Sequence, residues 1–115
     1  MNSRIEKLED FLKDNPGNAL MQYSLGVEYL RIGQPERAIV PLRAAIAAKS
    51  NYSAAYRELG KALGQAGLTE EATAIYRQGI QTAQTNGDLQ TAKEMRVFLR
   101  RLTGEVLTAE EERCE

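Results

Sequence analysis

Apolar residues recur along the chain every three or four positions, the spacing that places them on one face of a helix. In the first segment, residues 4–14, this spacing ends at the run Asp-Asn-Pro-Gly of residues 14–17, a combination that stops a helix. A last segment, residues 88–102, has the same spacing and is closed by Gly104. Four further segments of this kind lie between them. The pattern therefore predicts six helices and no strand.

The four central segments form two copies of one unit, because identical residues recur 34 positions apart. The matching pairs are Leu25 and Leu59, Gly26 and Gly60, Gly33 and Gly67, Glu36 and Glu70, Ala38 and Ala72, Arg43 and Arg77, and Ile46 and Ile80. An offset that holds for small, large and turn residues alike indicates an internal repeat, with copies at 19–52 and 53–86. Within each copy we expect two helices joined by a tight turn, where Gly33 or Gly67 takes a left-handed conformation.

Polar residues and prolines mark the helix starts. Four side chains stand where they can cap the first turn of a helix: Asn18, Ser53, Thr69 and Asp88. Pro35 suits the first position of its helix, where no backbone N–H is needed. Pro41 lies further along the same helix and removes the hydrogen bond to the carbonyl of Arg37. We therefore expect a bend at Pro41, with that face of the helix turned to solvent.

The composition suits one soluble globular domain, since the 115 residues are 43% hydrophobic and 27% charged. We expect residues 1–104 to form this domain and residues 105–115 to be an acidic, flexible tail. The chain has no His and a single Cys, Cys114, which excludes clustered Cys and His zinc sites, His-based catalytic triads and disulfide frameworks. We expect no metal, no cofactor and no catalysis. The low cysteine content fits a reducing compartment such as the cytoplasm.

Charge is unevenly distributed along the chain. The net charge is −1, but residues 105–115 contain five Glu and one Arg, a balance of −4, which leaves +3 for residues 1–104. Most of that excess lies in Lys93, Arg96, Arg100 and Arg101. These charges wrap around more than one helix face, so nucleic acid is not an expected partner. The charged N-terminus lacks the apolar run of a secretory signal, and no stretch reaches the roughly 18 apolar residues of a membrane span.

The two copies resemble the tetratricopeptide repeat, a 34-residue unit of two antiparallel helices. The residues at the landmark positions of that family are Leu25, Gly26, Tyr29, Ala38, Leu42 and Ala45 in the first copy, and Leu59, Gly60, Leu63, Ala72, Tyr76 and Gly79 in the second. The family's preferred Trp is replaced by Gln22 and Tyr56, and its usual closing Pro by Ser50 and Gln84. The resemblance covers residues 4 to about 102. It implies an all-α, TPR-like right-handed α-solenoid of antiparallel helix pairs: an N-terminal half-repeat helix, two full repeats and a C-terminal capping helix.

Glycine inside a helix costs about 1 kcal/mol relative to Ala, so the two Leu-Gly pairs need a reason. In the family that the repeats resemble, the two helices of a repeat cross closely, and small residues let their backbones approach. We therefore expect each glycine to face small residues of the following helix. The expected contacts are Gly26 with Ala38 or Ala45, and Gly60 with Ala72 or Gly79.

The resemblance also implies a concave face, lined by the first helix of each copy and by the last helix. The residues expected on this face are Leu20, Tyr23, Val27, Leu30, Arg31, Arg57, Lys61, Gln65, Lys93, Arg100 and Arg101. The face would be apolar and aromatic at one end and basic at the other, with no acid between Arg57 and Lys61. It would suit an extended or helical segment with apolar and acidic residues. Two plainer interpretations stay open: the apolar residues pack against the first helix, and the cations lie on a solvated surface.

Two functions agree with these patterns. The first is a non-catalytic protein–protein interaction module whose groove binds an unidentified protein or peptide segment. The second is a small self-associating adaptor whose solenoid ends or tail join copies of the chain, which would then be a monomer or a weak homodimer. The tail is itself apolar and then acidic, and it could fold back over Lys93, Arg100 and Arg101.

Overall fold

The computed structural model describes residues 3–104, and these residues form six helices. The helices are α1 (Ser3–Asp14), α2 (Ala19–Arg31), α3 (Pro35–Ala48), α4 (Ser53–Gln65), α5 (Thr69–Asn86) and α6 (Leu89–Thr103). No strand occurs in this range, so the predicted all-α fold is confirmed. The expected flexible tail at 105–115 lies outside the described residues.

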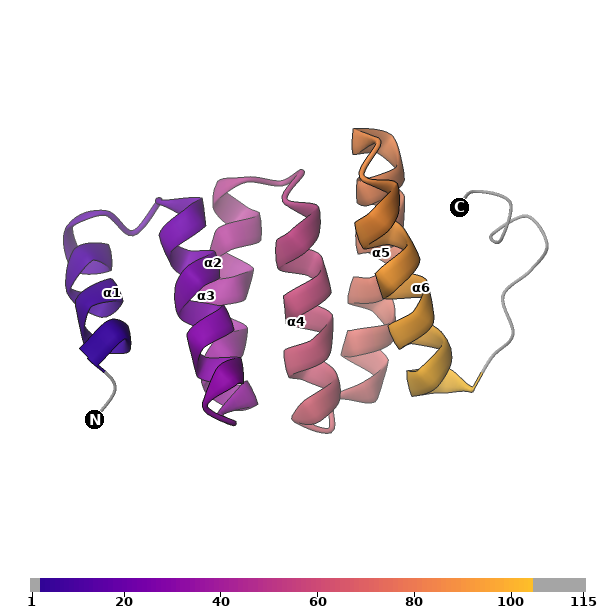
Figure 1. The fold of residues 1–115 in the computed structure, drawn as a ribbon, viewed down its shortest axis with the longest axis horizontal. Coiled ribbons are helices and arrows are strands. Elements are labelled where there is room, and N and C mark those ends of the chain that lie inside the picture. The colour runs from indigo at the N-terminus through magenta and orange to yellow at the C-terminus, as the bar shows by residue number, and fades with distance from the viewer. Residues whose placement is uncertain (1–2, 105–115) are drawn as a thin grey trace.

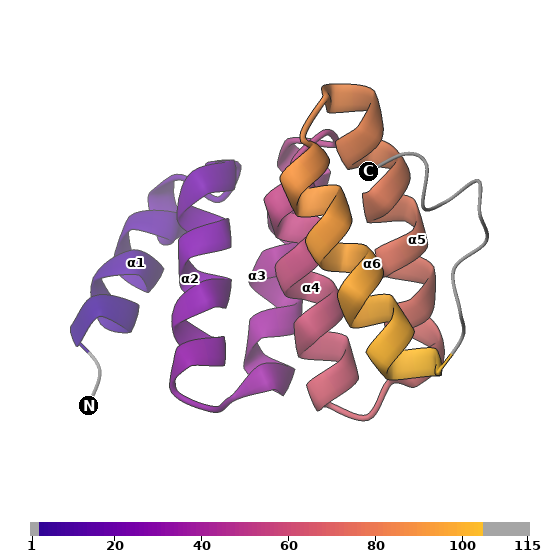
Figure 2. The same ribbon diagram turned by 45° about the vertical axis from the view of Figure 1, so that its right-hand side comes forward.

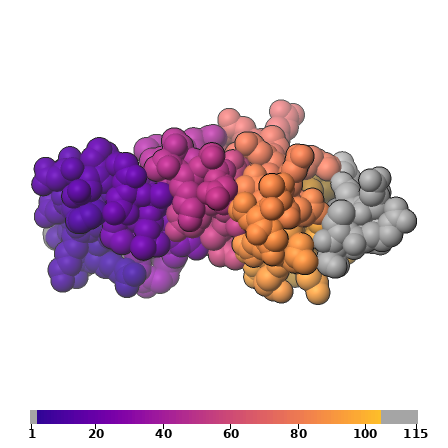
Figure 3. All heavy atoms as spheres, turned by 90° about the horizontal axis from the view of Figure 1, so that it is seen from above, coloured from indigo at the N-terminus to yellow at the C-terminus, as the bar shows by residue number. Residues whose placement is uncertain are grey.

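The helices follow one another along the longest axis of the molecule, from α1 at one end to α6 at the other, with α2 and α3 overlapping in this view (Figure 1). Each helix packs against its neighbours in the chain, and α4 additionally contacts both α2 and α6. These three helices therefore form one layer, with α3 and α5 behind it in the turned view (Figure 2). Seen from above, successive segments follow one another without interleaving (Figure 3). This is an open row of helix pairs, in which every contact joins near neighbours.

Two groups of buried apolar side chains form the core. One joins α1 to α5 around Leu42 and Leu59, and the other joins α4, α5 and α6 around Met95 and Leu99. The partly buried residues that pack against both groups are Ile46, Ile75 and Leu102. Burial is therefore continuous along the row. None of the described helices is long and apolar enough to cross a membrane.

Gly26 and Gly60 lie where the two helices of each repeat approach each other. A Cβ atom placed on Gly26 would stand 2.6 Å from Leu42 Cδ2, and one on Gly60 would stand 2.6 Å from Tyr76 Cδ1. Each glycine thus makes a gap that a large side chain of the next helix fills, which buries more surface than two small residues could. The nearest partners are therefore Leu42 and Tyr76, not the small residues expected from the sequence, which were Ala38 or Ala45, and Ala72 or Gly79.

Two of the four predicted helix caps are confirmed. The backbone N–H of Met21 donates to Asn18 Oδ1 at 3.0 Å, and that of Thr91 donates to Asp88 Oδ1 at 3.3 Å. Asn18 and Asp88 therefore cap α2 and α6 through their side chains. The predicted left-handed turns are confirmed as well, at Gly33 and Gly67, with φ of 77° and 82°.

Ser53 and Thr69 are wrong as caps, because they are the first residues of their helices. The cap positions belong to Tyr52 and Leu68, and neither side chain makes a capping bond. The Ser53 hydroxyl instead donates to Asp88 Oδ2 at 2.7 Å, which ties the start of α4 to the start of α6. This partner lies 35 residues away in the sequence, so no local pattern predicts the hydrogen bond.

Pro41 is buried, and the expectation that its face of α3 turns to solvent is wrong. The helix is continuous through this position. Pro41 follows Ala38 by three residues and precedes Ala45 by four, so all of them lie on one stripe. That stripe is covered because α3 packs against both α2 and α4.

Candidate functional site

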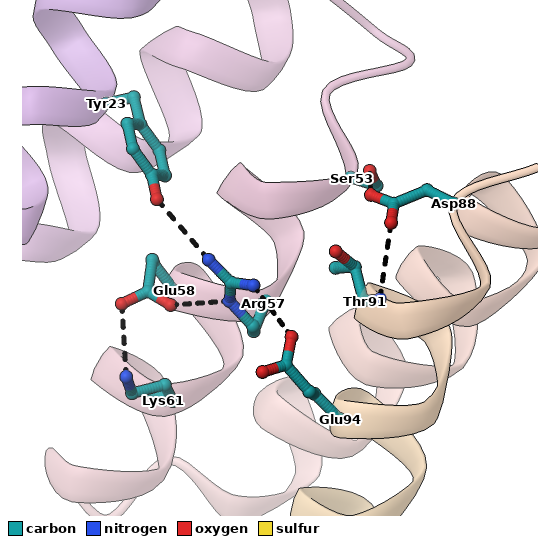
Figure 4. Close-up of polar contacts among 8 residues, drawn as sticks. All are labelled: Tyr23, Ser53, Arg57, Glu58, Lys61, Asp88, Thr91 and Glu94. Atoms are coloured by element: carbon teal, nitrogen blue, oxygen red, sulfur yellow. Dashed lines mark hydrogen bonds and ion pairs between the residues drawn. The ribbon is translucent and has the colours of Figure 1, made fainter. Parts of the chain in front are cut away.

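Side chains of α2, α4 and α6 meet in one polar network on the layer that these helices form (Figure 4). Arg57 of α4 stands at its centre. Its Nη1 donates to Glu94 Oε1 at 2.9 Å, its Nε to Glu58 Oε2 at 2.9 Å, and its Nη2 to the Tyr23 hydroxyl at 3.5 Å. The Nζ of Lys61 donates to Glu58 Oε1 at 3.1 Å. Tyr23, Arg57 and Lys61, all predicted for this face, are thus brought together around two carboxylates.

The charge of Arg57 is compensated within the network. Its side chain is 22% exposed, and burial alone would lower the pKa of the guanidinium. Hydrogen bonds and charge interactions with Glu58 and Glu94 outweigh burial and hold that pKa above its ordinary value. The expectation of no acid between Arg57 and Lys61 is wrong, because Glu58 bridges them. The sequence carried this signal, since Glu58 precedes Lys61 by three residues, a spacing that pairs side chains on a helix.

Tyr52 belongs to this face, although the sequence patterns did not indicate it. Its ring centroid lies 5.1 Å from that of Tyr23, with the ring planes tilted by 32°. Lys49 Nζ lies 4.9 Å from the centroid of the Tyr52 ring. Burial and, secondly, Tyr23 raise the pKa of the Tyr52 hydroxyl. Because Tyr52 lies in the turn before α4, outside the helical positions that the family resemblance points to, only the folded chain reveals its place.

The other predicted residues of α2 divide between core and surface. Leu30 packs against the buried apolar group, whereas Leu20 is 57% exposed. Val27 is half-buried. Arg31 is exposed, and its Nε donates to Glu28 Oε2 at 2.8 Å. Of the residues predicted for α2, Leu30 therefore packs in the core, whereas Leu20 and Arg31 lie on the surface.

A pocket of about 330 Å³ opens at the end of this layer formed by α4 and α6. It is lined by Lys61, Gly64, Gln65, Tyr76, Phe98, Arg101 and Leu102. Three of the predicted residues, Lys61, Gln65 and Arg101, meet here. The centroids of the Tyr76 and Phe98 rings are 6.1 Å apart, and Lys61 Nζ lies 5.8 Å from the Phe98 centroid. Aromatic and aliphatic surface thus lies beside two cations.

The remaining predicted residues, Lys93 and Arg100, are exposed on α6 and do not line this pocket. Across residues 3–104 no group of three or more His, Cys, Asp or Glu is arranged to hold a metal ion. The aromatic surface of the pocket suits an apolar side chain, and the cations attract a carboxylate.

Comparisons with known proteins place this architecture among others of its kind. No protein-family profile matches the chain. It is 44% identical over 98 residues to the TPR repeat-containing protein PA0015 of Pseudomonas aeruginosa, a match that covers 85% of this chain and 93% of the relative. The solution structure of protein BPP2914 from Bordetella parapertussis has a TM-score of 0.76 and 38% identity, with 89% of each chain covered. The crystal structure of a tetratricopeptide repeat domain protein from Salinibacter ruber has a TM-score of 0.70 and 24% identity, covering 77% of this chain and 99% of that one.

Proposed function

The chain belongs to the tetratricopeptide repeat family, and on that premise we propose that it binds a segment of another protein, without catalysis, across the layer of α2, α4 and α6. The family suggests a protein–protein interaction module in general terms. The observation that carries the specific proposal is the pocket between α4 and α6, where aromatic surface and two cations converge. We also propose that residues 1–104 act as a single domain in this role.

The segment bound should combine a large apolar side chain with a neighbouring carboxylate. Phe98 and Tyr76 offer ring surface for the apolar group. Arg101 is exposed at the pocket, whereas Lys61 shares its charge with Glu58. Arg101 should therefore contribute more than Lys61 to attracting the acid.

The experiment titrates the ¹⁵N-labelled protein with a capped hexapeptide, Glu-Glu-Leu-Phe-Glu-Glu. Amide shifts should concentrate on the ends of α4 and α6, around Lys61, Phe98 and Arg101. The charge-reversing variant Arg101→Glu should weaken binding about tenfold or more, because it replaces an attraction by a repulsion at the rim. A peptide in which Lys replaces every Glu should not bind.

The matched control is Lys7→Glu, the same charge change on an exposed residue of α1, far along the row from the pocket. It should leave the affinity unchanged. If Arg101→Glu and Lys7→Glu lower the peptide affinity equally, the effect comes from net charge alone, which would contradict the proposed site. Failure of both peptides to bind, together with a dimer in light scattering, would favour self-association instead.

A further inference from the structure

A second pocket, of about 480 Å³, lies where α4 and α6 begin. It is lined by Lys49, Asn51, Tyr52, Ser53, Ala54, Asn86 and Asp88. The first pocket, at Phe98 and Arg101, is lined by later residues of α4 and α6. The two pockets therefore lie at opposite ends of this helix pair, and the ion pair of Arg57 with Glu94 lies between them (Figure 4).

Two hydrogen bonds between distant segments fix the walls of the second pocket. The Ser53 hydroxyl donates to Asp88 Oδ2 at 2.7 Å, and Asn86 Nδ2 donates to the backbone carbonyl of Asn51 at 2.7 Å. Each bond joins residues 35 positions apart and ties the turn before α4 to the turn before α6. The pocket is therefore preformed, as ligand pockets usually are.

Asp88 supplies this pocket with a carboxylate that no contacting cation neutralises. It accepts from the Ser53 hydroxyl and the Thr91 N–H, which occupy two of the roughly four acceptor positions of a carboxylate. Asp88 forms no ion pair within residues 3–104. The hydrogen bonds from Ser53 and Thr91, with the charge of Arg57 at longer range, outweigh burial and lower the pKa of Asp88. The half-buried side chain is therefore an anion at neutral pH.

The Tyr52 ring in the same pocket already holds an ammonium group. Lys49 Nζ lies 4.9 Å from the ring centroid, close enough for the attraction between a cation and an aromatic face. Lys49 is exposed, and in the part of the chain that the structure describes it forms no ion pair. The ammonium of a bound molecule can therefore take its place over the ring, beside the carboxylate of Asp88.

We propose that the second pocket binds a basic side chain of the same segment whose apolar and acidic residues bind the first pocket. This inference rests on the function proposed above. The acid of the segment would lie toward Arg101 and its base toward Asp88, so the two charges fix its direction across the helices. Between the pockets, Arg57 and Lys61 are already paired with Glu58 and Glu94. The middle of the segment should therefore be uncharged.

The length of α4 sets the spacing of the two charges. Ala54 lines the second pocket and Gly64 lines the first, and ten helical residues extend about 15 Å. An extended peptide advances about 3.3 Å per residue, so five residues cover about 16 Å. The basic residue of an extended segment should therefore stand about five positions from the apolar residue.

Calorimetric titration of the full chain with capped peptides tests this spacing. The peptides are Lys-Ser-Ser-Ser-Leu-Phe-Glu-Glu, its reverse Glu-Glu-Phe-Leu-Ser-Ser-Ser-Lys, and versions of both with Gln in place of Lys. In one of the two directions, the Lys peptide should bind about three- to fivefold more tightly than its Gln version, as expected of a solvent-accessible ion pair. The rearranged peptide Ser-Ser-Ser-Lys-Leu-Phe-Glu-Glu should gain nothing over the Gln version, because its Lys is too close to Phe.

Variants of the protein locate the gain. Asp88→Asn should remove the difference between the Lys and Gln peptides and leave the affinity for the Gln peptide unchanged. The matched control, Asp14→Asn at an exposed acid of α1, should keep the difference. Lys49→Gln should increase it, because this substitution removes the competing ammonium.

Four outcomes would contradict the second pocket. Equal affinities of the Lys and Gln peptides in both directions, with binding still weakened by Arg101→Glu, would overturn it and leave the proposed function intact. A difference that persists in Asp88→Asn would overturn it as well, and so would weaker binding of the Lys peptide to Lys49→Gln. Failure of every peptide to bind would contradict the proposed function and this inference together.

Discussion

The two repeats use the same positions for the same packing but present different surfaces. Gly26 and Gly60 are equivalent, and each receives the large residue found 16 positions later, Leu42 or Tyr76. On the outer face of the same helices, Tyr23 and Val27 of α2 stand where α4 has Arg57 and Lys61. The crossing of the helices constrains the interior, whereas the surface tolerates exchange of an aromatic residue for a cation.

Where the two repeats stack, their different surface residues contact each other. Arg57 donates to the hydroxyl of Tyr23, its own equivalent 34 residues earlier. Two acids, Glu58 and Glu94, compensate the cation at the same time. The residues that the two repeats share therefore align the helices. The residues in which the repeats differ determine the chemistry of the surface.

The packing at the two helix crossings is tested most directly by replacing each glycine with alanine, which adds one methyl group. Gly60→Ala should lower the free energy of unfolding by about 2–3 kcal/mol, because its Cβ would meet the rigid ring of Tyr76. Gly26→Ala should cost less, about 1–2 kcal/mol, because the buried Leu42 side chain has rotatable bonds with which to adjust, whereas a ring has none. Urea denaturation followed by circular dichroism measures both.

Gly17→Ala is the control, since a Cβ there would meet nothing within 4 Å. It should be close to neutral. If Gly26→Ala costs as much as Gly60→Ala, the rigidity of the partner side chain does not distinguish the two repeats.

The comparison of surfaces is tested by removing one arginine from each helix. Arg57→Met should cost about 2 kcal/mol, because it leaves the carboxylate of Glu58, 9% exposed, with Lys61 alone. Arg31→Met should cost less than about 1 kcal/mol, because Arg31 is 62% exposed and, among the described residues, binds Glu28 alone, and Glu28, although 8% exposed, keeps its ion pair with Arg4. Thermal unfolding at low and high salt measures the difference, and equal costs would contradict the special place of Arg57.

The smallest effect concerns the two confirmed caps, one neutral and one charged. Hydrogen bonding from Ser53 and then Thr91 outweighs burial and lowers the pKa of Asp88 below its ordinary value. The ionised form is thus favoured in the folded state, so its contribution is present at neutral pH and is lost as the pH falls through that lowered pKa, below about pH 4. Asp88→Asn should therefore cost about 1 kcal/mol at pH 7 and clearly less at an acidic pH below that lowered pKa.

Asn18→Ala supplies the comparison, because an amide cap does not titrate in this range. It should cost about 1 kcal/mol at both pH values. Urea denaturation at the two pH values decides the matter. A cost of Asp88→Asn that does not change with pH would show that its bonds to Ser53 and Thr91 do not depend on its charge.

The sequence predicted most of the helices, turns and caps, but few of the side-chain contacts between one helix and another. Local patterns predicted the six helices within residues 3–104, the left-handed turns at Gly33 and Gly67, and the caps Asn18 and Asp88, and all of these are confirmed. The burial of Pro41 could also have been predicted from the sequence, since Pro41 lies on the same side of α3 as Ala38. The hydrogen bond from Ser53 to Asp88 could not, because nothing local distinguishes a serine that caps its own helix from one that bonds another.

The linear order of residues was enough to establish a row of paired helices, because hydrophobic spacing and a 34-residue offset are properties of the chain alone. Folding was needed to decide which side chain fills each glycine gap, to seat two acids around Arg57 and to bury Arg96. These outcomes depend on the rotation and crossing of neighbouring helices. Such geometry is set by the packing of the whole core, so no short stretch of sequence contains it.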